Sequence, residues 1–95
     1  MRAVRFLRSA ERDIEEIAAF LGHETPGRAD RALRMLMNRT GILADFPHLG
    51  VAVGAGVRQM VFKDRWNSFT VRYRATDRAI LISRIWHGKQ DRPSS

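Results

Sequence analysis

Two strand-like segments near the end of the chain constrain its fold more than any other feature. In residues 69–74, apolar Phe, Val and Tyr alternate with polar Thr and Arg, and residues 79–87 form a second, mostly apolar run. The short connection between them, residues 75–78, suits a tight hairpin. Because side chains alternate across a strand, one face of this hairpin is apolar and must pack on another element, while the other face carries arginines.

The register of this hairpin decides which side chains share a face. A turn at Thr76-Asp77 sets Arg74 opposite Ala79. Tyr73 then faces Ile80, Val71 faces Ile82 and Phe69 faces Arg84. The predicted core contacts are Phe69, Val71, Tyr73, Ile80, Ile82 and Trp86, and the predicted opposite face holds Thr70, Arg72, Arg74, Leu81, Ser83, Ile85 and His87. We expect Arg84 to reach solvent at the sheet end or to pair with an acid of the first helix.

The first residues of the chain predict a strand followed by an amphipathic helix. Residues 2–7 alternate, with Val4 and Phe6 on one face. Ser9 is the expected N-cap of the helix, and Gly22 stands where the helix should stop. Between them, apolar residues recur at helical spacing, and these form the expected buried stripe: Ile14, Ile17, Ala18 and Leu21.

A second amphipathic helix should follow, with Thr25 as its N-cap and Pro26 at its first position. It should end near Asp45, because Pro47 disfavours helical geometry at the preceding residue. Its expected apolar stripe is Ala29, Ala32, Leu33, Leu36, Thr40 and Leu43. Residues 47–56 contain three glycines and are predicted to be a loop, residues 57–62 a strand, and residues 63–67 a turn.

Together these segments predict an α+β protein with the order β-α-α-β-β-β. The N-terminal strand and the helical hairpin would pack on a small, mostly antiparallel sheet. Ninety-five residues predict a single domain over residues 1–95, with residues 89–95 as a flexible tail. The absence of cysteine excludes disulfides, and no apolar run approaches the length of a spanning helix. We therefore expect a cytoplasmic protein with no membrane partner.

Charge is distributed unevenly along the chain. The net charge is +7, with 8 basic and 7 acidic residues in positions 1–50 but 9 basic and 3 acidic residues in positions 51–95. Fifteen of the 17 basic residues are arginine, whose planar guanidinium matches carboxylates and phosphates and stacks on rings. Solubility alone would explain some of this charge, but its concentration in the second half favours an anionic partner, either a nucleic acid or an acidic protein segment.

Several local motifs, taken in order, carry a resemblance to a known family. They are residues 4–10 running into residues 13–18, the helix from Ala29 to Leu43, Phe-Pro-His-Leu-Gly at 46–50, Gly-Val-Arg at 56–58, Val-Arg-Tyr-Arg at 71–74, and residues 82–91. Across nearly the whole chain this order resembles the RelE/ParE superfamily of bacterial type II toxins. The Arg-Ile-Trp-His-Gly stretch at 84–88 is similar to the ParE-like branch.

This resemblance implies a toxin that arrests growth and is neutralised by a cognate antitoxin, expected to be of the ribbon-helix-helix type. ParE-like members act on DNA gyrase, whereas RelE-like members cut mRNA on the ribosome. Gyrase inhibition is the favoured expectation and mRNA cleavage the alternative; direct contact with nucleic acid is compatible with either. The chain departs from RelE-like nucleases, because the strand at 57–62 lacks a pair of lysines and no tyrosine follows the last strand.

The residues expected to bind the target or the antitoxin are Arg58, Arg65, Trp66, Arg72, Arg74, Arg84, His87 and Lys89. For a metal-free ribonuclease, the catalytic set would be Arg58, Arg72, Arg84 and His87, with arginines for the phosphate charge and the histidine as acid or base. A structural role for His87 at the strand end is the simpler alternative. His23 and His48 have no partner ligands nearby in sequence, so we expect neither a metal nor a cofactor.

Overall fold

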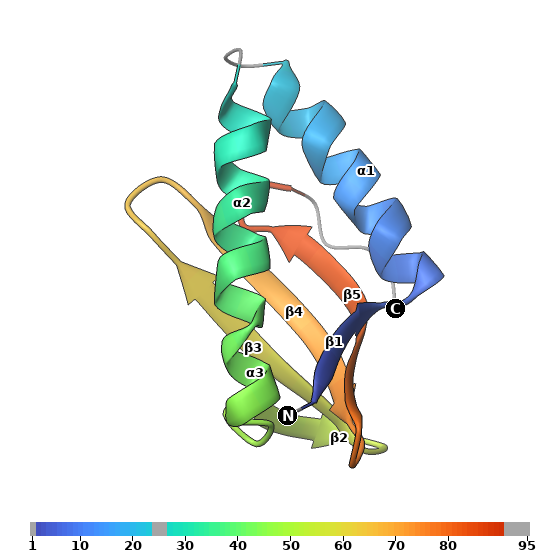
Figure 1. Ribbon diagram of the computed structural model, residues 1–95. Helices are drawn as coiled ribbons and strands as arrows, with labels where there is room; N and C mark the ends of the chain where they lie inside the picture. Colours follow the sequence, from blue (N-terminus) through green and yellow to red (C-terminus); the bar gives the residue numbers. More distant parts are fainter. Residues whose placement is uncertain (1, 24–26, 91–95) are drawn as a thin grey trace.

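The computed structural model describes residues 2–23 and 27–90, which form two helices and a short third one against a single five-stranded sheet (Figure 1). The elements are β1 (Ala3–Phe6), α1 (Arg8–Gly22), α2 (Arg28–Thr40), α3 (Ile42–Asp45), β2 (Val51–Gly54), β3 (Val57–Lys63), β4 (Ser68–Ala75) and β5 (Ala79–His87). The strand order is β1-β5-β4-β3-β2. β1 is parallel to β5 and the other pairs are antiparallel, so the predicted α+β class is confirmed.

The helices cover one face of the sheet, which we call the helix face (Figure 1). The core lies between the helices and the sheet and contains Ala10, Ile17, Leu21, Ala32, Leu36, Leu43, Phe62, Phe69, Val71, Tyr73, Ile80, Ile82 and Ile85. The predicted apolar stripes of both helices therefore face the sheet. We call the other side of the sheet the open face. Within residues 2–23 and 27–90, no helix is long and apolar enough to span a membrane.

The predicted start of the first helix is wrong by two residues, and the reason involves the sheet. α1 begins at Arg8 with Leu7 as its N-cap residue, so Ser9 already lies in the first turn. The Ser9 hydroxyl donates a hydrogen bond to the carbonyl oxygen of Ser83 at 2.6 Å. The side chain thus satisfies a strand carbonyl instead of capping its own helix. The predicted end at Gly22 is confirmed.

The predicted second helix ends where expected, but the structure divides it into two helices, α2 and α3. Thr25 and Pro26, the predicted N-cap and first residue, lie outside the described residues, and α2 is described from Arg28 onward. Gly41 separates α2 from α3, and the chain leaves the helix at Asp45 as predicted.

The predicted loop at residues 47–56 is wrong in part, because Val51–Gly54 is a strand, β2. It pairs with β3 through a turn in which Gly54, Ala55 and Gly56 all have positive φ angles. Glycine tolerates this left-handed geometry, so two of the three glycines mark a hairpin turn and not a long loop. The intervening Val-Ala-Val segment has the β-branched composition of a strand.

The predicted register between β4 and β5 is also wrong. Ala75 pairs with Ile80 and Tyr73 with Ile82, a shift of two residues from the prediction. The turn lies one residue further along the chain than expected, because the Thr76 N–H donates to the Ala79 carbonyl oxygen and the Thr76 hydroxyl accepts hydrogen bonds from the backbone N–H groups of Arg78 and Ala79. A shift of two residues leaves each side chain on its predicted face, so Tyr73, Ile80 and Ile82 are buried together as expected.

Beyond Tyr73 the ladder shifts by one more residue at a bulge, and this exchanges the faces of β5. Arg72 pairs with Arg84, Val71 with Ile85 and Phe69 with His87. The extra residue is Ser83, whose hydroxyl donates to the carbonyl oxygen of Arg72 at 3.2 Å. Ile85 and His87 therefore lie on the helix face, against prediction, and Trp86 is buried as predicted but lies on the open face.

Gly50 is held where a side chain would not fit. A methyl group there would lie 2.8 Å from the Tyr73 ring and 2.9 Å from the Gln59 carbonyl oxygen. We expect Gly50→Ala to lower the free energy of unfolding by about 1–3 kcal/mol, because the clash displaces a buried ring. Urea unfolding of Gly22→Ala is the control: nothing lies within 4 Å of its added methyl group, so it should be neutral or slightly stabilising. Equal effects of the two changes would contradict this packing.

Candidate functional site

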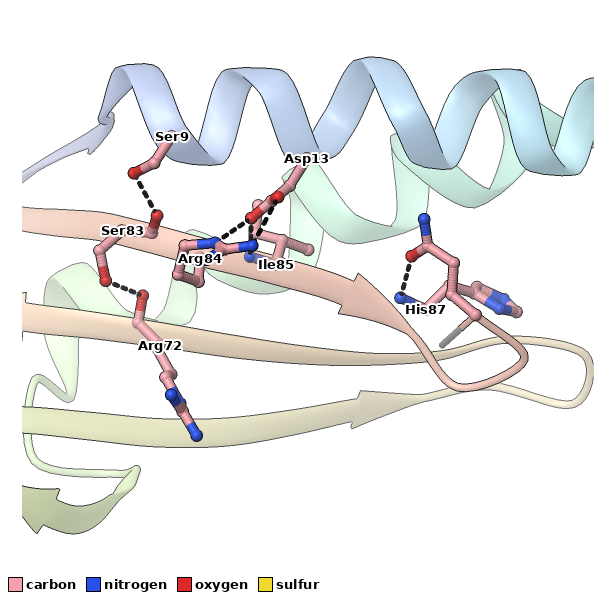
Figure 2. A network of polar contacts seen from close by, with 8 residues as sticks. Ser9, Asp13, Arg72, Ser83, Arg84, Ile85 and His87 are labelled. Atoms are coloured by element: carbon pink, nitrogen blue, oxygen red, sulfur yellow. Dashed lines mark hydrogen bonds and ion pairs between the residues drawn. The ribbon is translucent and has the colours of Figure 1, made fainter. Parts of the chain in front are cut away.

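A buried carboxylate joins the first helix to the last strand. Asp13 of α1 accepts two hydrogen bonds from the Arg84 guanidinium, at 2.9 and 3.2 Å, and one from the backbone N–H of Ile85 at 2.8 Å (Figure 2). Its side chain is 8 % exposed and that of Arg84 is 31 % exposed. The hydrogen bond and the charge of Asp13 raise the pKa of Arg84 above its usual value. The predicted pairing of Arg84 with an acid of the first helix is confirmed.

The same helix closes the edge of β5. β1 pairs with β5 only as far as Ile82, so the backbone groups beyond that residue need other partners. The N–H of Leu7 donates to the Ile82 carbonyl oxygen. Figure 2 shows the next two contacts, in which the Ser9 hydroxyl donates to the Ser83 carbonyl oxygen and Asp13 accepts from the N–H of Ile85. The start of α1 therefore continues the role of β1 along the strand.

Arg72 covers the Trp86 ring on the open face. Arg72 donates from Nε to the Gln59 side chain at 3.0 Å, and its guanidinium lies 5.1 Å from the centre of the Trp86 ring system. Arg74 is exposed on the same face. Beside Arg72 a hollow of about 360 Å³ is lined by Val53, Gly54, Val57, Arg72, Ser83 and Arg84. Cations and apolar atoms thus meet on a surface that the helices leave uncovered.

Arg58 lies on the helix face, because it pairs with Tyr73 across β3 and β4. Its guanidinium donates to the Gly50 carbonyl oxygen at 2.8 Å. The Tyr73 hydroxyl donates to the Pro47 carbonyl oxygen and accepts from the N–H of Gly50. Arg58 and Tyr73 therefore hold the segment that leads from α3 into β2.

His87 is 1 % exposed on the helix face, where its ring meets the edge of Phe69 at 5.2 Å between centroids. Its Nδ1 accepts from the backbone N–H of Lys89 at 3.2 Å. That bond assigns the ring hydrogen to Nε2, which donates to the Asn67 side-chain oxygen at 3.0 Å. Both nitrogens thus brace the β3–β4 turn and the chain after β5.

The structure brings together only two of the four predicted nuclease residues, Arg72 and Arg84. Arg58 is engaged with the backbone on the helix face, Arg72 and Arg84 lie beside the open-face hollow, and His87 is enclosed in the core. Among the described residues no group of three or more His, Cys, Asp or Glu could hold a metal ion.

The remaining predicted contact residues gather at the β3–β4 turn, residues 64–67. Trp66 is 68 % exposed, with the Arg65 guanidinium 5.4 Å from the centre of its ring system, and Lys89 is exposed beside it. Sequence reasoning missed the residue that shapes this turn, Asp64, whose carboxylate accepts from the N–H groups of Trp66 and Asn67. An Asp at the start of a turn is the signal that could have found it.

The sequence of this chain is similar to those of known toxins. A family profile described as "ParE toxin of type II toxin-antitoxin system, parDE" matches residues 4–92. Toxin RelE3 of Caulobacter vibrioides is 27% identical over 97% of this chain and 100% of its own length, and toxin RelE1 of the same organism is 28% identical over 87% and 89%.

Two solved structures share the fold. The chromosomal ParDE toxin–antitoxin system of P. aeruginosa aligns with a TM-score of 0.74 at 24% identity, covering 90% of this chain and 94% of that one. The RelBE2 complex of Mycobacterium tuberculosis aligns with a TM-score of 0.57 at 25% identity, covering 90% and 96%. The fold and the matches define a toxin of a type II toxin–antitoxin system. Within that class, the chain belongs to the ParE toxin family, and its partner is a cognate antitoxin.

The Asp13 contacts should contribute strongly to stability. We expect Asp13→Ala to lower the free energy of unfolding by about 1.5–3 kcal/mol, because it removes charge-assisted bonds and leaves the Ile85 N–H without its acceptor. Asp13→Asn should lose less, since its amide oxygen can still accept from Ile85. The matched control is Glu15→Ala, an exposed acid on the same helix. If thermal and urea unfolding show the Asp13 and Glu15 variants to be equally stable, the proposed role of Asp13 is wrong.

Proposed function

We propose that this toxin arrests growth by inhibiting DNA gyrase through surface contacts, without catalytic residues of its own. The observation that carries the proposal is the position of His87. Metal-free RNA cleavage needs a base or acid within hydrogen-bond reach of the substrate. His87 is 1 % exposed, and its ring nitrogens contact Asn67 and Lys89.

The arginines support the same conclusion. Catalysis requires cations preorganised around one phosphate. Arg58 lies on the opposite side of the sheet from Arg72, and Arg84 is bound by Asp13 in two hydrogen bonds. What the surface offers is a set of arginine and aromatic side chains of the kind that dominate protein–protein binding.

Ribosome-dependent mRNA cleavage is the second candidate, and two observations favour it. The curated relatives are named RelE toxins. In addition, Arg72, Ser83 and Arg84 line one hollow on the open face, where a phosphate could approach two guanidinium groups. Because His87 is buried, mRNA cleavage would need another residue as its acid or base.

For the antitoxin, which we expect to be of the ribbon-helix-helix type, we propose a site at the β2 edge of the sheet. β2 is the last strand in the sheet order, and Val51 and Val53 are 71% and 48% exposed. An extended antitoxin segment can add to such an edge by backbone hydrogen bonds and bury both valines. Its carboxylates would then lie near the open-face arginines, which suits a partner that carries negative charge.

The gyrase proposal is tested with purified proteins. Gyrase incubated with this toxin should lose supercoiling activity and accumulate cleaved DNA, because the toxin would trap the enzyme on its cut substrate. Antitoxin added beforehand should prevent both effects. Normal supercoiling in the presence of toxin that still arrests growth, together with cut mRNA on ribosomes, would reject the gyrase proposal in favour of mRNA cleavage.

If the antitoxin binds at the β2 edge, a charged residue introduced there should weaken its binding. We expect Val51→Lys to weaken antitoxin binding about tenfold or more, since burial of a valine contributes about 1.5–3 kcal/mol. Leu7→Lys is the control: Leu7 is 41% exposed and follows β1, at the other edge of the sheet. Isothermal titration at two salt concentrations would measure both effects. Affinity should fall only modestly with salt; a collapse at high salt would mean that charge, not apolar burial, holds the complex.

A further inference from the structure

The β3–β4 turn holds a large aromatic side chain in solvent. Trp66 is 68% exposed, yet the turn beneath it is closed by several hydrogen bonds. Asp64 Oδ1 accepts from the N–H groups of Trp66 and Asn67 at 2.8 and 2.7 Å, and the Asp64 N–H donates to the Asn67 carbonyl oxygen at 2.9 Å. Exposure of an indole gains nothing for folding. A fixed, exposed indole therefore suggests binding.

The turn is also fastened to the end of β5. The Asn67 side chain is bound by His87, and the N–H of Gly88 donates to the Ser68 carbonyl oxygen at 2.7 Å. Partial burial opposes ionisation of Asp64, but the N–H donors of Trp66 and Asn67, with Arg39 nearby, outweigh it and lower the pKa of the carboxyl. Asp64 thus stays charged and keeps accepting at neutral pH, so Trp66 meets a partner preorganised.

Basic side chains surround the indole. A hollow of about 480 Å³ lies between the turn and the start of α2, lined by Arg28, Arg31, Asp64, Trp66 and Asn67. A second hollow of about 390 Å³ on the other side of the turn is lined partly by Lys63, Arg65 and Lys89. Among the described residues that line these hollows, five are Arg or Lys, and the one carboxylate, Asp64, is occupied by the turn itself.

We propose that this surface, Trp66 with Arg31, Lys63, Arg65 and Lys89, binds single-stranded nucleic acid. A base would stack on the indole from the larger hollow, which Arg65 does not line, while the Arg65 guanidinium lies over the ring. The flanking phosphates would lie against the basic side chains on both sides of the turn. Base–aromatic stacking between cationic groups is the usual means of holding a single strand without reading its sequence.

A single strand fits better than a duplex or an acidic peptide. In a duplex the base faces are covered by their neighbours, so the indole would have nothing to stack on. An acidic peptide would match the cations but offer no flat ring for Trp66. This inference does not depend on the identity of the toxin's target, since binding is measured in the absence of gyrase and of ribosomes.

The test is the fluorescence anisotropy of a labelled oligothymidylate of about 12 nucleotides, long enough to cross such a surface. Titrated at low salt with the full-length toxin, it should show saturable binding. Trp66→Ala should raise Kd about five- to hundredfold, the range measured for loss of one stacked base, and Trp66→Phe should retain part of the affinity. Trp66 is exposed and Trp86 is 5% exposed, so quenching of indole emission by the oligonucleotide should disappear in Trp66→Ala.

Charge controls separate stacking from general attraction. Arg65→Ala should weaken binding and reduce the dependence of log K on log salt by about 0.7 if it contacts one phosphate. Arg78→Ala removes the same charge from the β4–β5 turn, at the other end of the sheet, and should change Kd less than about twofold, as expected for a distant surface charge. Thermal melting of each variant checks that it is folded.

Several results would overturn the proposal. They are no binding at low salt, equal affinity for the matched duplex, or an unchanged Kd in folded Trp66→Ala. Equal affinity for thymidine monophosphate would make this a nucleotide site and not a strand site. If Trp66→Ala weakens only the complex with the antitoxin, the surface belongs to that protein partner instead.

Discussion

The structure depends on how the edge of β5 is completed beyond the end of β1. β1 is four residues long and β5 is nine, so a parallel partner covers only the first part of the last strand. The start of α1 supplies the rest through Leu7, Ser9 and Asp13. Because Asp13 also binds Arg84, one carboxylate fixes the helix, the strand edge and an arginine of the open face. Loss of these contacts would leave buried backbone groups unpaired, which is costly in a small core.

The bulge at Ser83 decides which chemistry each face can support. Without it, Ile85 and His87 would face solvent beside Arg72, where the histidine would be available to a substrate. With it, His87 enters the core against Phe69, and Trp86 moves to the open face under the Arg72 guanidinium. One inserted residue thereby converts a possible catalytic group into a structural one. This is why the open face presents arginines, with the Trp86 indole buried beneath Arg72, and no exposed acid or base from β5.

Periodicity was enough to predict the element order apart from β2, both helical stripes, the ends of the helices and the class of the fold. For Arg84 the sequence offered two alternatives, solvent at the sheet end or an acid of the first helix, and the structure has the second. Three features could not be predicted. The bulge has no periodic signal, since one extra residue in a strand looks like ordinary sequence until its partner strand is known. Strand β2 was not predicted because the glycines around it are as typical of a loop as of a hairpin turn. Ser9 resembled a cap because its real acceptor, Ser83, is far away in the chain.

The same reasoning explains why residue type predicted which side chains are exposed better than which side chains converge. Arg65, Trp66, Arg74 and Lys89 are exposed as their chemistry suggests, because exposure of a turn or strand face follows from local pattern. A catalytic set requires several residues to converge, and convergence depends on register. An error of one residue beyond Tyr73 moves His87 from one side of the sheet to the other. In that position the histidine still affects the surface, since it holds Asn67 and thereby the turn that displays Trp66. These contacts agree with the structural role at the strand end that was the simpler of the two predictions for His87.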